Sequence, residues 1–220
     1  IRDRSTLAAC LSGAVPHHYT GTFFGSVTVD GNDTCEVSLT DVSQIVGSVL
    51  QDIDTQMVAS VVEDEMLFGL ENFGVPHDQI EQRVSETLET VGISDLRDRE
   101  IATLSGGQKQ KVAIAAILAM RPRVLVLDEP TAALDPATAE KVLDLTRRVV
   151  AESHITCLMV THNMHQALEL GNRTLMMADG HIVLDVAGSE RAGMGVDDLI
   201  ARFKAGAGHE LDNDRILLSE

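Results

Sequence analysis

The chain has 220 residues, of which 44% are hydrophobic and 23% charged, so its composition is that of a globular protein with its own core. Its formal net charge of −17 argues against a nucleic-acid partner, because Lys and Arg supply most of the affinity for phosphate backbones. Three scattered cysteines without a C-x-x-C pair indicate neither a disulfide framework nor a zinc site, and no apolar run approaches the ~18 residues of a membrane span.

The first half of the chain mixes short strands with helices. Its apolar periodicity and turn residues predict a helix over 5–11, a strand over 25–29 closed by the turn pair Asp30-Gly31, a strand over 45–50, and helices over 61–72 and 77–91. The last two helices are separated by Gly74-Val75-Pro76 and form a predicted helical insert.

The second half alternates more regularly. The pattern predicts helices over 108–120, 137–152 and 164–170, strands over 124–127, 155–160 and 174–177, a turn at Asp179-Gly180 with a strand ending at 184, and a short amphipathic helix followed by an acidic tail within 196–220. The strand over 124–127 is uninterruptedly apolar, as in a parallel sheet buried on both faces. The fold class is therefore α/β, with helices on both sides of a mostly parallel sheet.

Two carboxylates follow this apolar strand, where open parallel sheets bind their ligands. Hydrolysis of a magnesium nucleotide needs one carboxylate for the metal's water shell and another that orients or deprotonates the attacking water. Asp128 suits the metal and Glu129 the water, and Pro130 ends the strand. The alternative is that an acidic pair after a strand merely solvates a loop.

A Ser-Gly-Gly run opens the helix predicted over 108–120. The hydroxyl of Ser105 and the backbone N–H groups of Gly106 and Gly107 lie at the positive end of the helix dipole, before Gln108, and predict a phosphate cradle. On local chemistry alone the same residues could be only a helix N-cap after a flexible turn.

These motifs together resemble those of the ATPase subunits of ABC transporters, and the resemblance covers nearly the whole chain. The matching segments are the signature motif at Leu104–Gln108 with its helix at Lys109–Met120, the Walker B strand at Val124–Glu129, the D-loop at Thr131–Asp135, the Q-loop residue Gln51 and the switch residue His162. The resemblance implies a P-loop NTPase-like sheet flanked by helices, and ATP and Mg²⁺ as cofactors.

The resemblance also assigns roles. Gln51 would contact the magnesium and report to a transmembrane partner, Asp135 would cross a dimer interface, and His162 would hydrogen-bond the γ-phosphate. Ser105 would cap the nucleotide of a second ABC ATPase subunit in a head-to-tail dimer, which an integral membrane transporter subunit would hold at the cytoplasmic face of the membrane. A lone histidine is more often a surface residue, and Gln56 competes with Gln51 for the Q-loop role.

The phosphate loop departs from the family pattern G-x-x-x-x-G-K-[ST]. In the run Ile1–Thr6, Ser5 and Thr6 align with the end of the motif, Arg4 with its Lys and Asp3 with its last Gly. The resemblance implies that Arg4, Ser5 and Thr6 bind the nucleotide, with Ser5 also at the metal. Asp3 brings a carboxylate where the backbone must approach an anion, and Arg4 keeps the charge without the compact ammonium. Truncation, residues from an upstream junction, or a degenerate site would each explain this start.

The resemblance predicts one ABC ATPase domain over 1–220, truncated at its N-terminus, with a helical subdomain over 61–120 and a C-terminal helix and tail over 196–220. The segments that resemble energy-coupling-factor importers are Pro16–Tyr19, Val46–Gln51, Gln56–Ala59, Val62–Glu65 and Phe68–Asn72, whereas Thr161–Met164 and Gly171–Thr174 resemble uncharacterised ABC import ATPases. We expect an ATP hydrolase that powers import. One alternative is a non-hydrolysing cassette that serves a partner's site. The other, a soluble ABC ATPase acting on nucleic acid or ribosomes, lacks the expected tandem cassettes.

Overall fold

The structure is a computed structural model that describes residues 2–19 and 21–207. Its contacts divide the chain into two compact units. The larger unit comprises residues 8–159, and the smaller unit comprises residues 1–7 with 160–220.

A three-stranded sheet with the order β3-β4-β5 organises the centre of the chain. Its strands are β3 (Val46–Val49), β4 (Val124–Asp128) and β5 (Thr156–Val160). β3 and β4 are parallel, with Val49 opposite Leu127, and both of these side chains are fully buried. The three predicted strands are confirmed, although Ile45 belongs to the preceding helix and β4 extends to Asp128.

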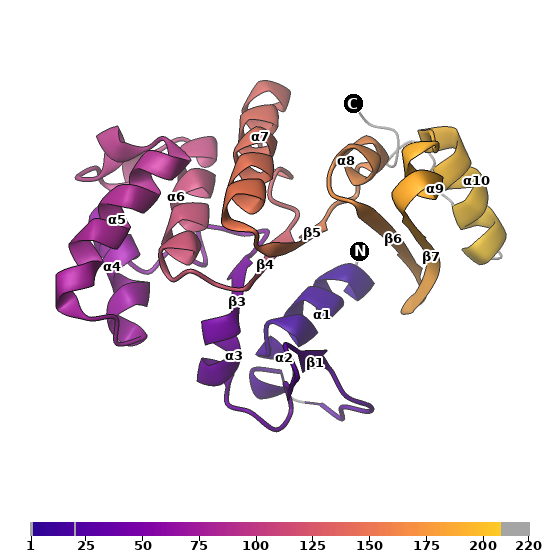
Figure 1. Cartoon of the computed structure of the whole chain (residues 1–220), viewed down its shortest axis with the longest axis horizontal. Helices are drawn as coiled ribbons and strands as arrows, with labels where there is room; N and C mark the ends of the chain where they lie inside the picture. The colour runs from indigo at the N-terminus through magenta and orange to yellow at the C-terminus, as the bar shows by residue number, and fades with distance from the viewer. Residues whose placement is uncertain (1, 20, 208–220) are drawn as a thin grey trace. The chain divides into compact units, whose positions relative to one another are not determined.

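Three helices pack together beside the sheet in the larger unit (Figure 1): α4 (Val62–Asn72), α5 (His77–Val91) and α6 (Gly106–Ala119). Two 3-10 turns, η1 (Ser94–Leu96) and η2 (Ile101–Thr103), connect α5 to α6. Apolar residues recur every three or four positions along α4 and α5, so that each helix buries one face. Fully buried side chains include Met66, Leu70, Val84, Leu88 and Ile114. The long helix α7 (Pro136–Ser153) contacts α5 and α6.

The N-terminal segment holds α1 (Arg2–Leu11), α2 (Ala14–His17), a hairpin of β1 (Thr28–Val29) and β2 (Asn32–Asp33), and α3 (Leu39–Ile45). The predicted strand over 25–29 is wrong in length, since only two residues pair. Its turn is confirmed, with φ of 51° at Asp30 and 81° at Gly31, the left-handed pair that a tight hairpin requires. Helix α3 was not predicted, although the Ser38 capping box with Asp41 is a local signal for its start.

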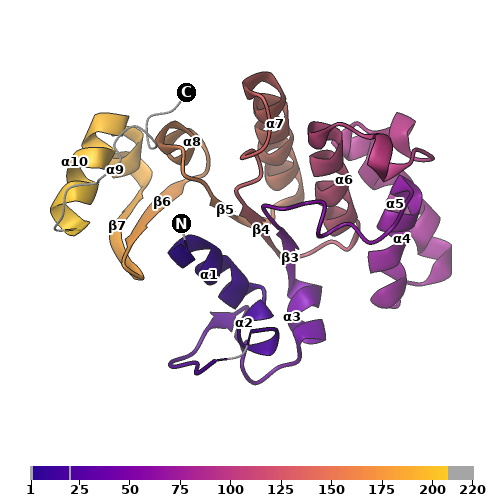
Figure 2. The same cartoon turned by 180° about the vertical axis from the view of Figure 1, so that it is seen from behind.

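In the smaller unit, β6 (Arg173–Ala178) and β7 (His181–Ala187) form an antiparallel hairpin whose turn residues, Asp179 and Gly180, have φ of 48° and 77°. The helices α8 (Met164–Glu169), α9 (Gly188–Ala192) and α10 (Val196–Ala207) surround it, and Figure 2 shows this hairpin from behind. β7 continues three residues beyond the predicted end. The amphipathic helix expected within 196–220 is confirmed as α10, which buries Leu199 and Phe203, while the predicted tail lies outside the described residues.

Within the described ranges, no helix combines the length and the hydropathy that a membrane-spanning segment requires.

Candidate functional site

The carboxyl edge of the β3–β4 pair brings together three of the predicted site residues. Val49 and Leu127 are register partners, so Gln51 follows β3 at the edge where β4 delivers Asp128 and Glu129. Parallel strands present their carboxyl ends on the same side of the sheet, which is where open α/β sheets bind ligands. The local sequence predicted each strand, and the parallel register puts the strand end before Gln51 beside the strand end that carries the two acids.

Asp128 is the buried residue of this group. Its side chain is buried, and its Oδ1 atom has no hydrogen-bond partner among the described residues. A buried, unpaired carboxylate oxygen costs free energy unless a cation or a donor reaches it. Oxygen ligands from carboxylates and water are those that Mg²⁺ prefers, so the residue fits the predicted metal-binding role.

Glu129 directly follows β4 in an uncommon backbone conformation. Its φ is 50°, in the left-handed region that L-residues other than glycine, Asn and Asp rarely occupy, and its side chain is half-buried. Such conformations cost about 1–3 kcal/mol and concentrate at functional sites. The turn that holds it includes a hydrogen bond of 3.1 Å from the Ala132 N–H to the Glu129 carbonyl.

The loop after β3 is closed by Gln56, the residue that competed with Gln51 in the sequence. The Gln56 Oε1 accepts a hydrogen bond of 2.9 Å from the Leu50 N–H, and its Nε2 donates one of 2.8 Å to the Ser48 carbonyl. Both ends of the amide are therefore used to turn the chain at the end of the strand. Gln51 is exposed.

Two further contacts of this loop were not predicted from the sequence. Oε2 of the buried Glu65 accepts hydrogen bonds from the N–H groups of Val58 and Ala59, at 2.9 and 2.8 Å. The Lys109 ammonium pairs with Asp54 at 2.6 Å, which joins the first turn of α6 to the loop across 55 residues of sequence. Local patterns carry no signal for a pair so far apart in the chain.

The signature segment begins α6 with a capping box. The Ser105 Oγ accepts a hydrogen bond of 3.3 Å from the Gln108 N–H, and the Ser105 N–H donates one of 2.9 Å to the Gln108 Oε1. The N-cap interpretation is thus confirmed. It remains compatible with the predicted phosphate cradle, because the hydroxyl accepts in the cap and its hydrogen stays available as a donor.

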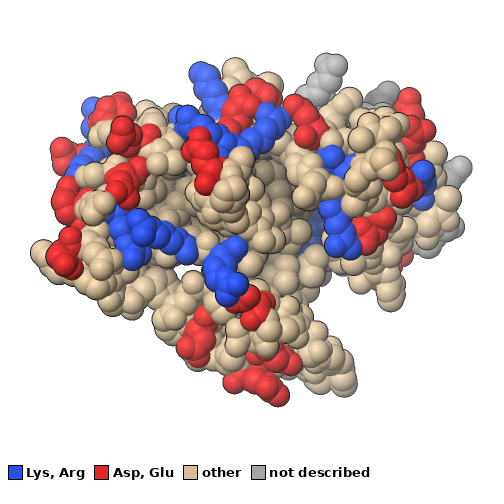
Figure 3. Space-filling model, viewed as in Figure 1, with Lys and Arg blue, Asp and Glu red and all other residues tan. Residues whose placement is uncertain are grey.

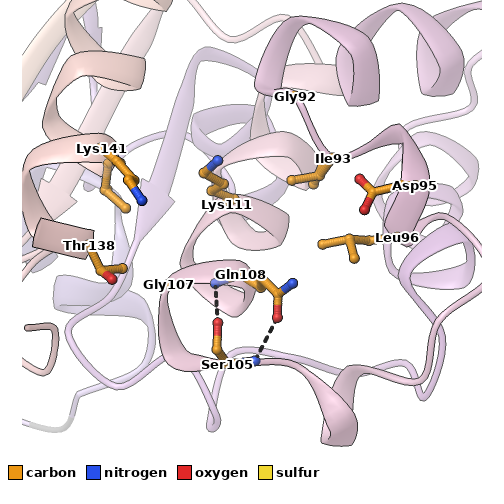
Figure 4. A pocket seen from close by; sticks show the side chains of 11 residues that line it. Gly92, Ile93, Asp95, Leu96, Ser105, Gly107, Gln108, Lys111, Thr138 and Lys141 are labelled. Atoms are coloured by element: carbon orange, nitrogen blue, oxygen red, sulfur yellow. Dashed lines mark hydrogen bonds between the residues drawn. The ribbon is translucent and has the colours of Figure 1, made fainter.

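The starts of α6 and α7 lie against one another. A Cβ atom on Gly107 would lie 2.2 Å from Cγ2 of Thr138, whereas one on Gly106 would meet only Cδ2 of Leu134, at 3.4 Å. Asp135 is the N-cap of α7 and accepts a hydrogen bond of 3.1 Å from the Thr138 N–H. Hydrogen bonds from Thr138 hold the pKa of Asp135 below its ordinary value. The helix that follows the signature segment therefore packs directly against the helix that follows the D-loop segment (Figure 4).

The remaining predicted residues belong to the smaller unit. Arg4, Ser5 and Thr6 lie in the first turns of α1, and Arg4 Nη1 donates a hydrogen bond of 2.8 Å to the Thr161 carbonyl. This bond brings Arg4 close to the loop that carries His162, whose side chain is half-buried. The predicted residues thus form two groups, one in each unit.

The loop around His162 is fixed by its neighbours. Thr161 Oγ1 donates to Gln166 Oε1 at 2.9 Å and accepts from the Asn163 N–H at 3.1 Å, and Asn163 caps α8 through the Gln166 N–H at 3.1 Å. These bonds hold the backbone on both sides of the histidine.

An α/β sheet with a buried acidic strand end, and a helix that starts with serine and glycine, point to the class of α/β nucleotide-binding domains. Residues 4–132, more than half of the chain, match the ABC transporter family, and the chain belongs to that family. The resemblance drawn from the motifs is therefore confirmed.

Several relatives share this similarity, each named "Putative ABC transporter ATP-binding protein". A relative from Streptomyces coelicolor is 45% identical over 174 residues, which cover 79% of this chain and 31% of the relative. One from Methanosarcina mazei is 42% identical over 182 residues, covering 83% of this chain and 31% of the relative. One from Pyrococcus horikoshii is 42% identical over 182 residues, which cover 83% of this chain and 64% of the relative. The chain thus spans less than a third of the first two relatives.

Among solved structures, the chain is similar to CbiO1 from Clostridium perfringens, which is described as part of the ABC transporter complex CbiONQ. The TM-score is 0.76 at 29% sequence identity, and the match covers 92% of this chain and 78% of that chain. The predicted α/β fold with a parallel sheet and flanking helices is confirmed by this match.

Proposed function

We propose that this chain binds and hydrolyses ATP with Mg²⁺ and powers an ABC-type importer. The observation that carries the proposal is the buried Oδ1 of Asp128 at the end of β4, which has no hydrogen-bond partner in the described ranges. Glu129 follows it, and the neighbouring strand end leads to Gln51. Mg²⁺ would neutralise charge on the phosphate oxygens. Asp128 would hold the water shell of the metal, Gln51 would contact the metal, and Glu129 would orient the attacking water and accept its proton.

The residues of the smaller unit would bind the phosphates. Arg4 supplies positive charge at the position of the family's lysine, and Ser5 and Thr6 lie in the first turns of α1. By the family resemblance, Ser5 would also be a ligand of the metal. His162 donates a hydrogen bond to the γ-phosphate. The bond from Arg4 to the Thr161 carbonyl supports a shared location of these groups, because it joins their two segments directly.

The signature residues Ser105–Gln108 and Asp135 would serve the nucleotide of a second ABC ATPase subunit in a head-to-tail dimer. Ser105, Gly106 and Asp135 are exposed, and each lies at a helix start where N–H groups favour an anion. The proposed subdomain over 61–120 would move with the signature residues as one body.

An integral membrane subunit would contact the loop of Gln51, placing the chain at the cytoplasmic face of the membrane. Leu50, Val58 and Phe68 are large apolar side chains that remain about half exposed in this loop and on α4, at 48%, 59% and 52%. Large exposed apolar side chains are often found at protein interfaces when they form a patch. Import is the direction implied by the resemblance of several sequence segments to energy-coupling-factor importers, and CbiO1 is described as part of an ABC transporter complex.

The test is ATP hydrolysis by the full chain with and without the Glu129→Gln substitution. We expect a loss of about 10²- to 10⁴-fold, while Glu152→Gln, an exposed change on α7, leaves the rate unaltered. Specific activity should fall on dilution, and a flat profile would exclude the dimer. Hydrolysis seen only after addition of an intact second cassette would favour the non-hydrolysing alternative.

A further inference from the structure

Helix α8 begins directly after the loop that carries His162, so the placement of this histidine depends on the placement of the helix. The side chain of Asn163 is the N-cap of α8 and accepts a hydrogen bond of 3.1 Å from the Gln166 N–H. The helix has only six residues. A helix this short is marginal by itself and takes its stability from tertiary contacts. The contacts of α8 therefore decide where the loop before it lies.

The other end of α8 is held by one guanidinium group. Nη2 of Arg191, which lies on α9, donates hydrogen bonds to three carbonyls at this end. They belong to Ala167, Leu168 and Leu170, at 3.2, 2.6 and 2.5 Å. The last carbonyls of a helix have no donors within the helix and carry the negative end of its dipole, so a cation there is stabilising. Arg191 therefore caps the carboxyl-terminal end of α8.

A buried threonine fixes the orientation of this guanidinium. Nε of Arg191 donates to Oγ1 of Thr174 at 2.8 Å, and the same hydroxyl donates to the Ala167 carbonyl at 2.6 Å. Thr174 lies on β6 and is only 4% exposed. A planar guanidinium can direct its donors to both acceptors at once, which an ammonium group cannot do with the same geometry. Arg191 thus joins α8, α9 and β6 within the smaller unit.

The charge of Arg191 is not used in an ion pair. In the part of the chain that the structure describes, its hydrogen bonds all go to the three carbonyls and to Thr174. Acidic residues outnumber Lys and Arg by 34 to 17, and basic groups on one face lie among acidic ones (Figure 3). Arg173, on the neighbouring hairpin, pairs with Asp185 in this way. The positive charge of Arg191 instead acts on the end of α8.

The start of α8 is connected in turn to the residues that we propose to contact the phosphates. Oγ1 of Thr161 donates to Oε1 of Gln166, in the first turn of α8, at 2.9 Å. The Thr161 carbonyl accepts the hydrogen bond of 2.8 Å from Arg4. His162 lies between Thr161 and the N-cap Asn163. A displacement of α8 would therefore move the backbone on both sides of His162 and the acceptor of Arg4.

We propose that Arg191 is a positioning residue for ATP hydrolysis, which holds His162 and Arg4 in place through α8. The inference rests on the proposed function, in which these two residues contact the phosphates. Without Arg191, three carbonyls at the end of α8 lose their donor, so the helix frays or shifts. A misplacement of about 1 Å at a catalytic group costs on the order of 10²-fold in rate, even when the altered residue is far from the chemistry.

Steady-state ATP hydrolysis by the full chain with Arg191→Met tests the proposal, because Met is a long side chain without donors. We expect kcat to fall by about 10- to 100-fold, while thermal melting verifies that the variant is folded. Arg191→Lys keeps a cation without the planar fork and should recover part of the rate. The matched control is Arg173→Met, which removes the exposed pair with Asp185 from the same unit and should leave kcat unaltered.

A double-mutant cycle with His162→Ala separates positioning from general destabilisation. If Arg191 acts through His162, Arg191→Met should lower kcat much less in the His162→Ala background than in the unaltered chain. General destabilisation would lower the rate by the same factor in both backgrounds. Additive losses in this cycle would therefore overturn the proposal.

Hydrogen exchange measures the same connection without ATP. Arg191→Met should speed the exchange of the Asn163 and Gln166 amides, whose hydrogen bonds close the loop, and Arg173→Met should not. Unchanged exchange in Arg191→Met would also overturn the proposal. Absence of hydrolysis by the unaltered chain would instead contradict the proposed function, and the exchange rates would still decide whether Arg191 holds the loop.

Discussion

The Cβ position of Gly107 lies 2.2 Å from Cγ2 of Thr138, so the two helix starts approach too closely for any side chain at residue 107. A glycine at a helix start lets the backbone approach a bound anion closely. In this chain the packing of α6 on α7 independently requires Gly107, and Gly106 is under a much weaker constraint.

Gly107→Ala should therefore lower the free energy of unfolding by ~1–3 kcal/mol, the usual cost of overpacking. Thr138→Ser removes the methyl group and keeps the hydroxyl, so the double variant should regain most of the loss. Urea unfolding of the four proteins in a double-mutant cycle measures this coupling. Gly106→Ala is the control and should change stability little, and additive effects of the two substitutions would contradict the packing explanation.

Gln56 and Gln51 should separate stability from activity. Gln56→Ala removes hydrogen bonds to Leu50 and Ser48 and should lower the free energy of unfolding by about 1 kcal/mol. Gln51→Ala, at an exposed position, should leave stability within ~0.5 kcal/mol and reduce ATP hydrolysis. Chemical denaturation and a steady-state ATPase assay make the comparison. Normal hydrolysis in Gln51→Ala would remove this residue from the proposed site.

Arg97 links α4 to α5 through two ion pairs. We expect their contribution to the free energy of unfolding to depend on pH. Its guanidinium pairs with Glu63 at 2.5 Å and with Glu81 at 2.7 Å. Hydrogen bonds from Arg97 hold the pKa of Glu81 below its ordinary value, and a hydrogen bond from Ser85 adds a smaller contribution in the same direction. A carboxylate whose pKa is lowered on folding stabilises the fold above its unfolded-state pKa, and that stabilisation is lost as the pH falls through the folded-state value.

The difference in unfolding free energy between the unaltered chain and Arg97→Gln should consequently shrink between about pH 6 and about pH 3. Unfolding in guanidinium chloride at each pH measures this difference. Arg202→Gln, which removes an exposed pair with Glu190, is a control for general charge effects. A difference that is constant across this range would show that Glu81 does not contribute through its ionisation.

The three thiols should differ in reactivity. Burial raises the pKa of Cys157 to about 11, so roughly one thiol in a thousand is ionised at pH 8, and the thiolate is the nucleophile. The Cys35 side chain is exposed. Partial desolvation and the nearby Asp33 carboxylate raise its pKa above the ordinary value. In a labelling time course with a disulfide reagent, Cys35 should react first and Cys157 last. Denaturant should abolish the difference, and rapid labelling of native Cys157 would contradict its burial.

The sequence alone determined most of the regular elements and the motifs. Helix α5 has the bounds that its periodicity predicts, since Ile80, Val84, Leu88 and Val91 occur at helical spacing on one buried face. The Asp-Gly turns were also predictable because only residues that tolerate positive φ fit them. The order of the motifs along the chain was sufficient to indicate the family.

Short helices could not be predicted from periodicity. Helix α9 spans five residues and buries none of them, so it has no apolar periodicity to detect. Between Gln51 and Gln56 the sequence favoured Gln51 only by its position at the strand end, because both residues follow the same strand and have the same chemistry. Only the folded loop shows that Gln56 is committed to the backbone.

The tertiary structure alone decided the contacts between residues distant in the sequence. Among the residues that the structure describes, it leaves Oδ1 of Asp128 buried without a hydrogen-bond partner, pairs Lys109 with Asp54, and places Lys111 and Lys141 at one cavity. Local sequence sets backbone preference and the direction of the apolar face. Which side chains then meet, and which charges remain unpaired, depends on how the helices and strands pack, and that packing is a property of the whole fold.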